Sequence, residues 1–478
     1  MKLLISKLWR RLIRAKLKKL TTENLLQESD VLFLKAVKKA VRTSHAYRLL
    51  LEESKLHLEP PLTIQQILNK FPVLEKKTLF GRFSLQELIC DEYSVTQMAS
   101  ILTSSGHGGA GFALGLSTAQ QMKAAPPMID FGLNMAFEVD RYSSLLINCL
   151  PMGVTFQSNA VCVANVSVRE DMACAILEQA GHFFQQIIIV GDPLFLKNFC
   201  DYSNARGIDW GKFRTHVVIG EETFPETYRS YLAKALQIKM KEDDGIIISS
   251  MGVAELGLNL FTETRETIAL RQILTEKNDL LNEIFKVKEK IKTVPTFFIY
   301  SPLRIYVEIV NQDHSGIGDL VVTVLDLKAA VPMIRYRTGD RAAKFDCKKA
   351  REILGDELPT LQDVNLPLLA LFGREKDRLP DNGHVDEYKE ALYRDNDIAR
   401  EISGAFKLSF RADQFLWEIQ LKKMSTADPA QIESALANQI FERRNHTKIV
   451  CFPYEKFPYG QVLDYERKFN YWRSEQNT

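Results

Sequence analysis

Five short apolar runs between residues 144 and 252 constrain the fold more than any other feature of the sequence. They are rich in β-branched side chains, and stretches such as REDMACAILEQAGHFF between them are long enough for a helix. The runs are SLLINCL, VCVANVSV, QIIIVGD, HVVIGEE and GIIISSMG. Runs without polar alternation predict strands buried on both faces, and helix-length spacers are typical of βαβ units. We therefore predict an α/β fold with a largely parallel sheet, whose ligands usually lie beyond the carboxyl ends of the strands.

The remainder of the chain predicts two further structural regions. TFFIY, RIYVEIV and DLVVTVLD follow one another without helix-length spacers, which predicts antiparallel strands in a β subdomain. The segment FGREKDRLPDNGH is rich in charge, Gly and Pro and marks a boundary. After it, the pattern predicts helix, strand, strand, helix and strand. We expect a large domain over 1–372, with a mainly helical lead-in over 1–90, and a small α+β domain over 373–478.

Composition supports two domains and excludes several classes of protein. A chain of 478 residues exceeds the size at which a single core usually stops growing. With 26% charged residues and a net charge of +2, it resembles an ordinary globular protein, and we expect no nucleic-acid partner. The seven cysteines are scattered and never spaced as C-x-x-C. This argues against a disulfide framework or a zinc knuckle and favours a cytoplasmic location.

Residues 1–20 carry eight basic residues and no acidic one. The charges interrupt any apolar core of a secretory signal. Five apolar residues recur at helical spacing: Leu4, Leu8, Trp9, Leu12 and Ile13. Two interpretations follow. The segment forms a peripheral helix on an anionic membrane surface, or it forms a terminal helix that packs its Leu and Trp side chains on its own domain.

The segment ILTSSGHGGAGFALGLS at 101–117 is dense in glycine. Such a turn exposes backbone N–H groups that can converge on an anion, and the Ser104 and Ser105 hydroxyls can add donors to phosphate oxygens. The segment is not a P-loop, because G-x-x-x-x-G-K-[ST] is absent.

Three later stretches extend this pattern: GIIISSMGVAELG at 245–257, PMIRYRTGD at 332–340 and FGREKDRL at 372–379. Together with S-S-G-x-x-G, their order and spacing resemble adenylate-forming enzymes of the ANL superfamily. The sequence is most similar to the phenylacetate-CoA ligase and acyl-protein synthetase branch. HAYR, FPVLEKK and GEETFPETYR extend the resemblance over most of the chain.

The resemblance implies ATP-dependent activation of a carboxylic acid as acyl-AMP, with Mg²⁺, followed by transfer to a thiol. Coenzyme A is the expected acceptor, and a carrier-protein pantetheine or a protein thiol remains an alternative. Because 145–170 is rich in small and apolar residues, we expect an aromatic or fatty acid rather than an amino acid. The small domain is expected to be mobile. A homodimer remains open.

The resemblance also assigns roles to individual residues. Asp340 is expected to accept hydrogen bonds from both ribose hydroxyls, and Arg374 to contact ribose or phosphate. Glu255 is expected to bind Mg²⁺ and Lys376 to act as the hinge. The remaining expected nucleotide contacts are Ser104, Ser105, Gly106 and Gly109 at the phosphates, Gly220, Glu221 and Glu222 along adenine, and Met251 and Gly252.

The sequence departs from the family pattern at three places. Met251 replaces the usual tyrosine, so aromatic stacking on adenine is not expected from this position. His107 lies where the family has a hydroxyl residue, and it either donates to phosphate or substrate or is a polar loop residue. Gln461 replaces a lysine that would offset charge at the α-phosphorus. Lys468 or Lys456 is a candidate replacement. If neither serves, the chain is a catalytically impaired nucleotide-binding regulatory protein.

Overall fold

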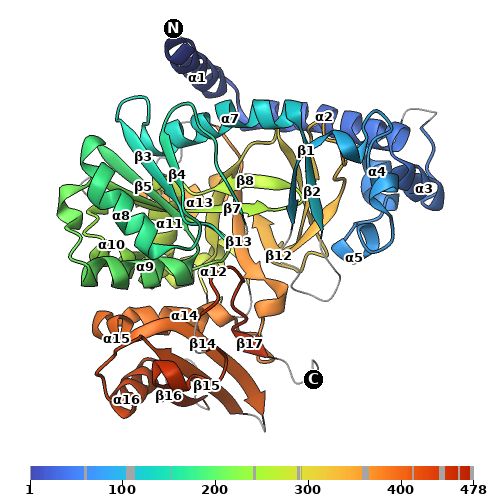
Figure 1. Ribbon diagram of the computed structural model, residues 1–478. Coiled ribbons are helices and arrows are strands. Elements are labelled where there is room, and N and C mark those ends of the chain that lie inside the picture. The colour runs from blue at the N-terminus through green and yellow to red at the C-terminus, as the bar shows by residue number, and fades with distance from the viewer. Residues whose placement is uncertain are drawn as a thin grey trace.

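The computed structural model describes residues 2–58, 62–103, 113–151, 153–240, 244–287, 291, 293–357, 365–411, 414–440, 447–460 and 463–473. Over these residues the chain forms a central sheet of eleven strands, a two-stranded hairpin and a separate four-stranded sheet. Figure 1 shows the four-stranded sheet, with its helices, at the opposite end of the molecule from the amino terminus.

The five apolar runs are confirmed as strands β3 to β7, in the order β4-β3-β5-β6-β7, and each pairs in parallel with its neighbours. Alternate residues face opposite cores. In β5, Ile187 and Ile189 pack with α8, α9 and α10, whereas Ile188 and Val190 pack toward α7 and α11. This burial on both faces explains why the runs lack an alternation of apolar and polar residues. The bounds are β3 (Ser144–Asn148), β4 (Cys162–Asn165), β5 (Gln186–Gly191), β6 (Thr215–Ile219), β7 (Ile246–Val253), α7 (Ala119–Phe137), α8 (Glu170–Ala180), α9 (Pro193–Ala205), α10 (Glu226–Ala235) and α11 (Arg265–Glu276).

The predicted antiparallel strands are also present, but they continue the central sheet instead of forming one of their own. β8 folds back on β7 as an antiparallel neighbour, and β9, β13, β12, β11 and β10 follow in that order. The carboxyl end of β7 therefore lies where the two halves of one sheet meet. The bounds are β8 (Gly257–Thr262), β9 (Thr296–Tyr300), β10 (Ile305–Val310), β11 (Gly318–Val324), β12 (Tyr336–Lys344), β13 (Leu368–Arg374), α12 (Asn278–Phe285) and α13 (Cys347–Leu354).

The amino-terminal region is mainly helical, as predicted, and packs on the antiparallel half of the sheet. Phe33 of α2 stacks on Tyr306 of β10 with ring centroids 4.2 Å apart. No helix in the described parts of the chain is long and apolar enough to cross a bilayer. The bounds are α1 (Lys2–Lys19), α2 (Thr22–Thr43), α3 (His45–Glu53), α4 (Ile64–Lys70), α5 (Lys76–Leu79) and α6 (Leu85–Leu88), followed by the hairpin strands β1 (Met98–Thr103) and β2 (Leu114–Thr118).

The carboxyl-terminal region, called here the C-terminal unit, contains the predicted order of helix, strand, strand, helix and strand. A short last strand, β17, adds to the sheet edge in parallel with β14, which the sequence did not reveal. The predicted boundary after residue 372 falls within β13 of the central sheet. The bounds are α14 (Val385–Arg394), α15 (Asn396–Glu401), β14 (Ile402–Arg411), β15 (Gln414–Leu421), α16 (Pro429–Ile440), β16 (Thr447–Phe452) and β17 (Trp472–Arg473).

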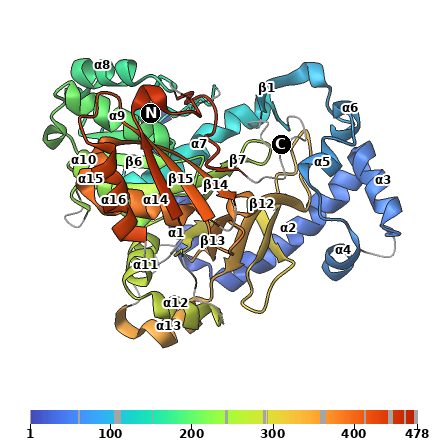
Figure 2. The ribbon, with the colours of Figure 1, turned by 90° about the horizontal axis from the view of Figure 1, so that it is seen from below.

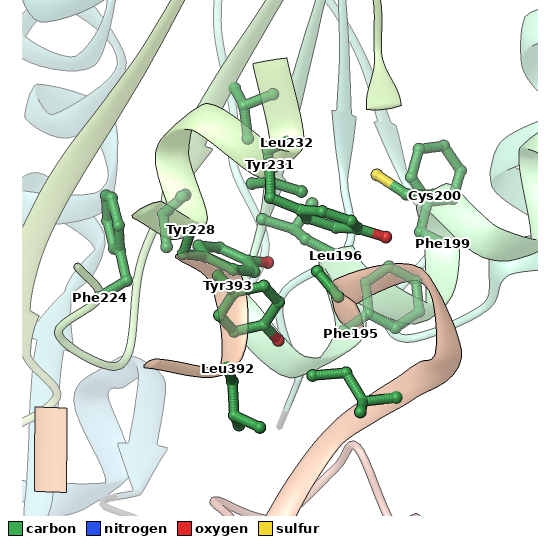
Figure 3. Packing of buried hydrophobic residues seen from close by; sticks show 14 of the residues in the cluster. Phe195, Leu196, Phe199, Cys200, Phe224, Tyr228, Tyr231, Leu232, Leu392 and Tyr393 are labelled. Atoms are coloured by element: carbon green, nitrogen blue, oxygen red, sulfur yellow. The ribbon is translucent and has the colours of Figure 1, made fainter. Parts of the chain in front are cut away.

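One buried apolar cluster joins the C-terminal unit to the parallel half of the central sheet. Figure 3 shows its centre, where Tyr393 at the end of α14 meets Tyr228 and Tyr231 of α10. The Tyr393 ring centroid lies 4.7 Å from that of Tyr228 and 5.4 Å from that of Tyr231. Figure 2, seen from below, shows α14 to α16 on the side of α9 and α10, with α3 to α6 on the other side. The C-terminal unit is therefore held against α9 and α10 by packed aromatic side chains.

Candidate active-site cleft

A cleft of about 2090 Å³ lies along the central sheet and reaches the C-terminal unit. Its lining includes ten of the expected nucleotide, metal, hinge and catalytic residues. These are Gly220, Glu221, Glu222, Met251, Gly252, Glu255, Asp340, Arg374, Lys376 and Lys468. Ser104, Ser105, Gly106, His107, Gly109 and Gln461 lie outside the described residues. Lys456, the alternative to Lys468, lies in an exposed turn and does not line the cleft.

Asp340 and Arg374 face each other on the paired strands β12 and β13. Arg374 Nε lies 3.8 Å from Asp340 Oδ1, and the Asp340 side chain is only 7% exposed against 36% for Arg374. Burial raises the pKa of Asp340, and the neighbouring Arg374 guanidinium partly opposes this rise. Each residue follows a glycine at positive φ, Gly339 at +84° and Gly373 at +95°. A side chain at either position would strain the backbone that presents the charged group.

The segment after β6 forms a strained turn at the edge of the cleft. Glu222 N–H donates to Gly220 O at 2.8 Å, and Glu221 between them has a φ of +70°. This combination is typical of a γ-turn, which is rare for a residue with a side chain. Lys468 of the C-terminal unit donates to Glu221 O at 3.2 Å, and its Nζ lies 2.7 Å from Glu221 Oε2. The Lys468 ammonium of the C-terminal unit thus binds the strained Glu221 turn of the central sheet.

A second set of polar contacts joins the same turn to α14. Lys389 Nζ lies 3.3 Å from Glu222 Oε2 and 3.5 Å from Asp386 Oδ1. Thr223 Oγ1 donates to Asp386 Oδ2 at 2.8 Å. Burial alone would lower the pKa of Lys389, but the two carboxylates raise it overall. Sequence reasoning missed Lys389, because α14 lies far from the glutamates along the chain and has no motif of its own.

Glu255 lies in the turn between β7 and β8, beside the hairpin of β1 and β2. A Cβ at Gly252 would lie 2.9 Å from Leu258 Cα, and one at Gly115 would collide with the Ala254 carbonyl oxygen. Both glycines therefore permit close approach of backbones around this turn. The Tyr336 hydroxyl donates to Glu255 Oε1 at 2.6 Å. Tyr336 opens the Y-R-T-G-D stretch, so that motif supplies both the partner of Glu255 and Asp340.

The residues present fit a magnesium ion bound together with a nucleotide. Mg²⁺ in such sites takes one or two carboxylates and completes its shell with phosphate oxygens and water. Glu255 supplies one carboxylate at the cleft wall, oriented by Tyr336. Among the residues that the structure describes, no group of three or more His, Cys, Asp or Glu side chains could hold a metal by itself.

The other end of the cleft is apolar. Val154 and Phe156, from the stretch 145–170 that is rich in small and apolar residues, line it. So do residues from α7, including Met122, Ala125, Met128 and Ile129, and residues Ile13 and Leu17 from α1. The cleft therefore joins a charged end, suited to a nucleotide, to an apolar end suited to an acyl chain.

No protein-family model and no characterised protein sequence matches the chain. Solved structures do match. One is 2-hydroxyisobutyryl-CoA ligase in the postadenylation state in complex with R3-HIB-AMP, with 12% identity and a TM-score of 0.68, covering 97% of this chain and 92% of that chain. The same ligase in complex with 2-HIB-AMP and CoA in the thioesterfication state has 12% identity and a TM-score of 0.55, covering 91% of this chain and 88% of that chain.

A second type of enzyme with a similar structure is an acyl acid amido synthetase in complex with 2,4-DB. Its identity is 13% and its TM-score 0.52, covering 92% of this chain and 88% of that chain. The chain therefore has the fold of adenylate-forming ligases. Its assignment to the phenylacetate-CoA ligase branch remains a prediction.

Proposed function

We propose that the protein uses ATP to activate an apolar carboxylic acid as acyl-AMP and then transfers the acyl group to a thiol, with coenzyme A as the acceptor. The observation that carries this proposal is the cleft itself. Asp340, Arg374, Glu255 and Lys468 all line this cleft. The same cleft also has an apolar end. These residues come from β12, β13, the β7–β8 turn and the C-terminal unit, and the fold brings them together.

The charged end binds the nucleotide in this proposal. The Asp340 carboxylate accepts hydrogen bonds from the two ribose hydroxyls, and Arg374 beside it contacts ribose or phosphate. The Gly220–Glu222 backbone lies along adenine, with Met251 and Gly252 as further contacts. Ser104, Ser105, Gly106 and Gly109 supply phosphate donors, and His107 adds to them.

Glu255 holds Mg²⁺ through its carboxylate, and the ion neutralises phosphate charge when bound. Tyr336 fixes the orientation of that carboxylate through its 2.6 Å hydrogen bond. The protein therefore contributes one carboxylate, that of Glu255, to the proposed magnesium site.

In the first half-reaction a carboxylate oxygen of the acid attacks the α-phosphorus of ATP. The new bond is oxygen to phosphorus, the bond to the bridging oxygen breaks, and pyrophosphate leaves with the electron pair. Negative charge increases around phosphorus in this step. Lys468 supplies the compensating positive charge, in place of the family's lysine whose position Gln461 occupies. Its location in the cleft supports Lys468 over Lys456.

In the second half-reaction the thiol sulfur attacks the acyl carbonyl and AMP leaves, giving a thioester. Lys376 is the proposed hinge for rotation of the C-terminal unit between the two steps. The 2-hydroxyisobutyryl-CoA ligase with CoA supports coenzyme A as the acceptor. A carrier-protein pantetheine or a protein thiol is the alternative.

A second candidate function is nucleotide binding without catalysis, in a regulatory role. Gln461 favours it, because a neutral amide cannot offset charge at phosphorus.

The test is ATP–pyrophosphate exchange with a panel of aromatic and fatty acids, followed by thioester detection with coenzyme A. Exchange that depends on one class of acid supports the ligase. Nucleotide binding without exchange for any acid favours the regulatory candidate. Exchange without thioester formation points to another acceptor.

A further inference from the structure

Helix α1 buries the charged side chain of Arg10 against the rest of the chain and leaves part of its apolar surface exposed. Four large apolar side chains on one face are exposed: Ile5 (61%), Leu8 (59%), Trp9 (37%) and Leu12 (61%). Their spacing places them on a single stripe of the helix. A surface helix normally buries such a stripe against its own domain. The expectation that α1 packs its Leu and Trp residues on its own domain is therefore wrong for Leu8 and Leu12.

Polar contacts attach α1 to the rest of the chain. Arg10 is only 1% exposed, and its Nε donates to Asp140 Oδ2 at 3.2 Å, with a second, close contact from Nη2 to Oδ1. Arg10 Nη1 also lies 3.7 Å from Asp130 Oδ2 on α7, and Lys7 donates to the Asp140 carbonyl at 2.8 Å. These contacts fix which face of α1 points outward.

We propose that α1 docks the protein on an anionic lipid bilayer and that the acid activated in the cleft is a fatty acid taken from that bilayer. The docking half stands on α1 alone, whereas the fatty-acid half rests on the proposed function. The exposed stripe would insert at the lipid interface, where Trp and Leu side chains are favourable.

Charge identifies the occupant of this face. The first twenty residues contain eight basic side chains and no acidic one, and Arg11, Lys16 and Lys19 lie exposed beside the stripe. Anionic lipid headgroups complement this charge. A second copy of α1 would bring two strongly basic helices together, which disfavours dimer formation through this face.

The position of α1 connects the surface to the cleft. Ile13 and Leu17 of α1 line its apolar end together with Met128 and Ile129 of α7. Figure 1 shows α1 next to α7 and far from the C-terminal unit. A docked α1 would therefore place the apolar end of the cleft at the bilayer and leave the nucleotide end toward water.

The first experiment is co-sedimentation of the full chain with vesicles of phosphatidylcholine alone or with 30 mol% phosphatidylglycerol, at low and high salt. We expect binding to the anionic vesicles that weakens with salt. The variant Leu8→Glu/Leu12→Glu should bind at least tenfold less. A matched control is Met172→Glu/Phe183→Glu, which changes two exposed apolar residues elsewhere and should bind like the wild type.

The docking proposal is wrong if the wild type stays in the supernatant with anionic vesicles, or if Leu8→Glu/Leu12→Glu sediments like the control. Concentration-dependent self-association that this variant abolishes, without vesicle binding, would identify a second copy as the occupant and overturn it too.

The second experiment compares pyrophosphate exchange with palmitate in anionic vesicles and with a short, water-soluble acid. Leu8→Glu/Leu12→Glu should slow exchange with the vesicle-borne acid at least tenfold and leave exchange with the soluble acid unchanged. Equal slowing of both, or exchange with soluble acids only, would overturn the fatty-acid half. Absence of exchange with every acid would refute the proposed function while leaving the vesicle result intact.

Discussion

Replacing Lys468 with methionine should abolish most of the acid-activating reaction while leaving the fold intact. Methionine keeps the length and apolar stem of the side chain but removes its charge. In the structure Lys468 Nζ lies 2.7 Å from Glu221 Oε2 inside the cleft, with exposures of 15% and 17% for the two side chains. The proposed reaction uses this ammonium at the α-phosphorus.

The expected loss follows from the electrostatics of a partly buried site. At an effective dielectric constant near 20, the unit charges of Lys468 and Glu221, 2.7 Å apart, attract by about 6 kcal/mol before desolvation is subtracted. This value shows how strongly the Lys468 ammonium acts on a negative charge at this place in the cleft. Loss of one preorganised contact to developing charge typically costs about 3–4 kcal/mol. At about 1.4 kcal/mol per factor of ten, we expect exchange to slow by about 100-fold to 1,000-fold.

The assay is ATP–pyrophosphate exchange at saturating acid, with Lys456→Met as the matched control because Lys456 is exposed and outside the cleft. Urea denaturation of both variants checks that the fold survives. Exchange by Lys468→Met within threefold of the wild type would refute the assignment of Lys468 as the compensating charge. Equal slowing in Lys456→Met would refute it as well.

Three further predictions concern stability. Burial raises the pKa of Asp192, the cap of α9, to about 7, so the folded state binds its proton more tightly and stability falls as pH rises from about 4 through 7. Asp192→Asn keeps the cap and should raise the unfolding free energy at pH 8 by about 2–4 kcal/mol, with no gain at pH 3.5, by urea denaturation. In Gly373→Ala a Cβ would lie 2.7 Å from the His384 ring at a φ of +95°, so we expect a loss of about 2–4 kcal/mol and a lower melting temperature; a wild-type melting curve would contradict this. Tyr393→Ala should lower the unfolding free energy by about 3–5 kcal/mol because it opens the cluster with Tyr228, whereas Tyr393→Phe should cost much less; equal effects of the two would contradict the packing argument.

Much of the fold could be predicted because local pattern and burial agree. Runs such as QIIIVGD have four consecutive apolar residues and no polar alternation, so a strand buried on both sides is the consistent interpretation. Short motifs then located the cleft, because residues at or just beyond the carboxyl ends of β6, β7 and β13, and residues from the first half of β12, all line it. The pattern could not show that β8 joins both halves into one sheet, since pairing of β8 with β7 depends on the close approach at Gly252.

The rest depended on contacts between residues distant in sequence. The Glu221 turn gains its partner Lys468 only when the C-terminal unit folds back, and the motifs that suggested each residue did not show that the two side chains pair. Likewise, the outward direction of the apolar face of α1 follows from Arg10 binding Asp140, which lies 130 residues further along the chain. Periodicity predicted that α1 is amphipathic but not which face it buries.

The central claim is that Asp340 binds the ribose of a nucleotide in the cleft. The most direct measurement is a comparison of ATP and 2′,3′-dideoxy-ATP binding to the wild type and to Asp340→Ala by titration calorimetry. Hydrogen bonds to a charged group contribute about 1.5–3 kcal/mol, so the wild type should prefer ATP by about 10-fold to 100-fold. Asp340→Ala should bind both nucleotides equally weakly. An undiminished preference for ATP in Asp340→Ala would contradict the account.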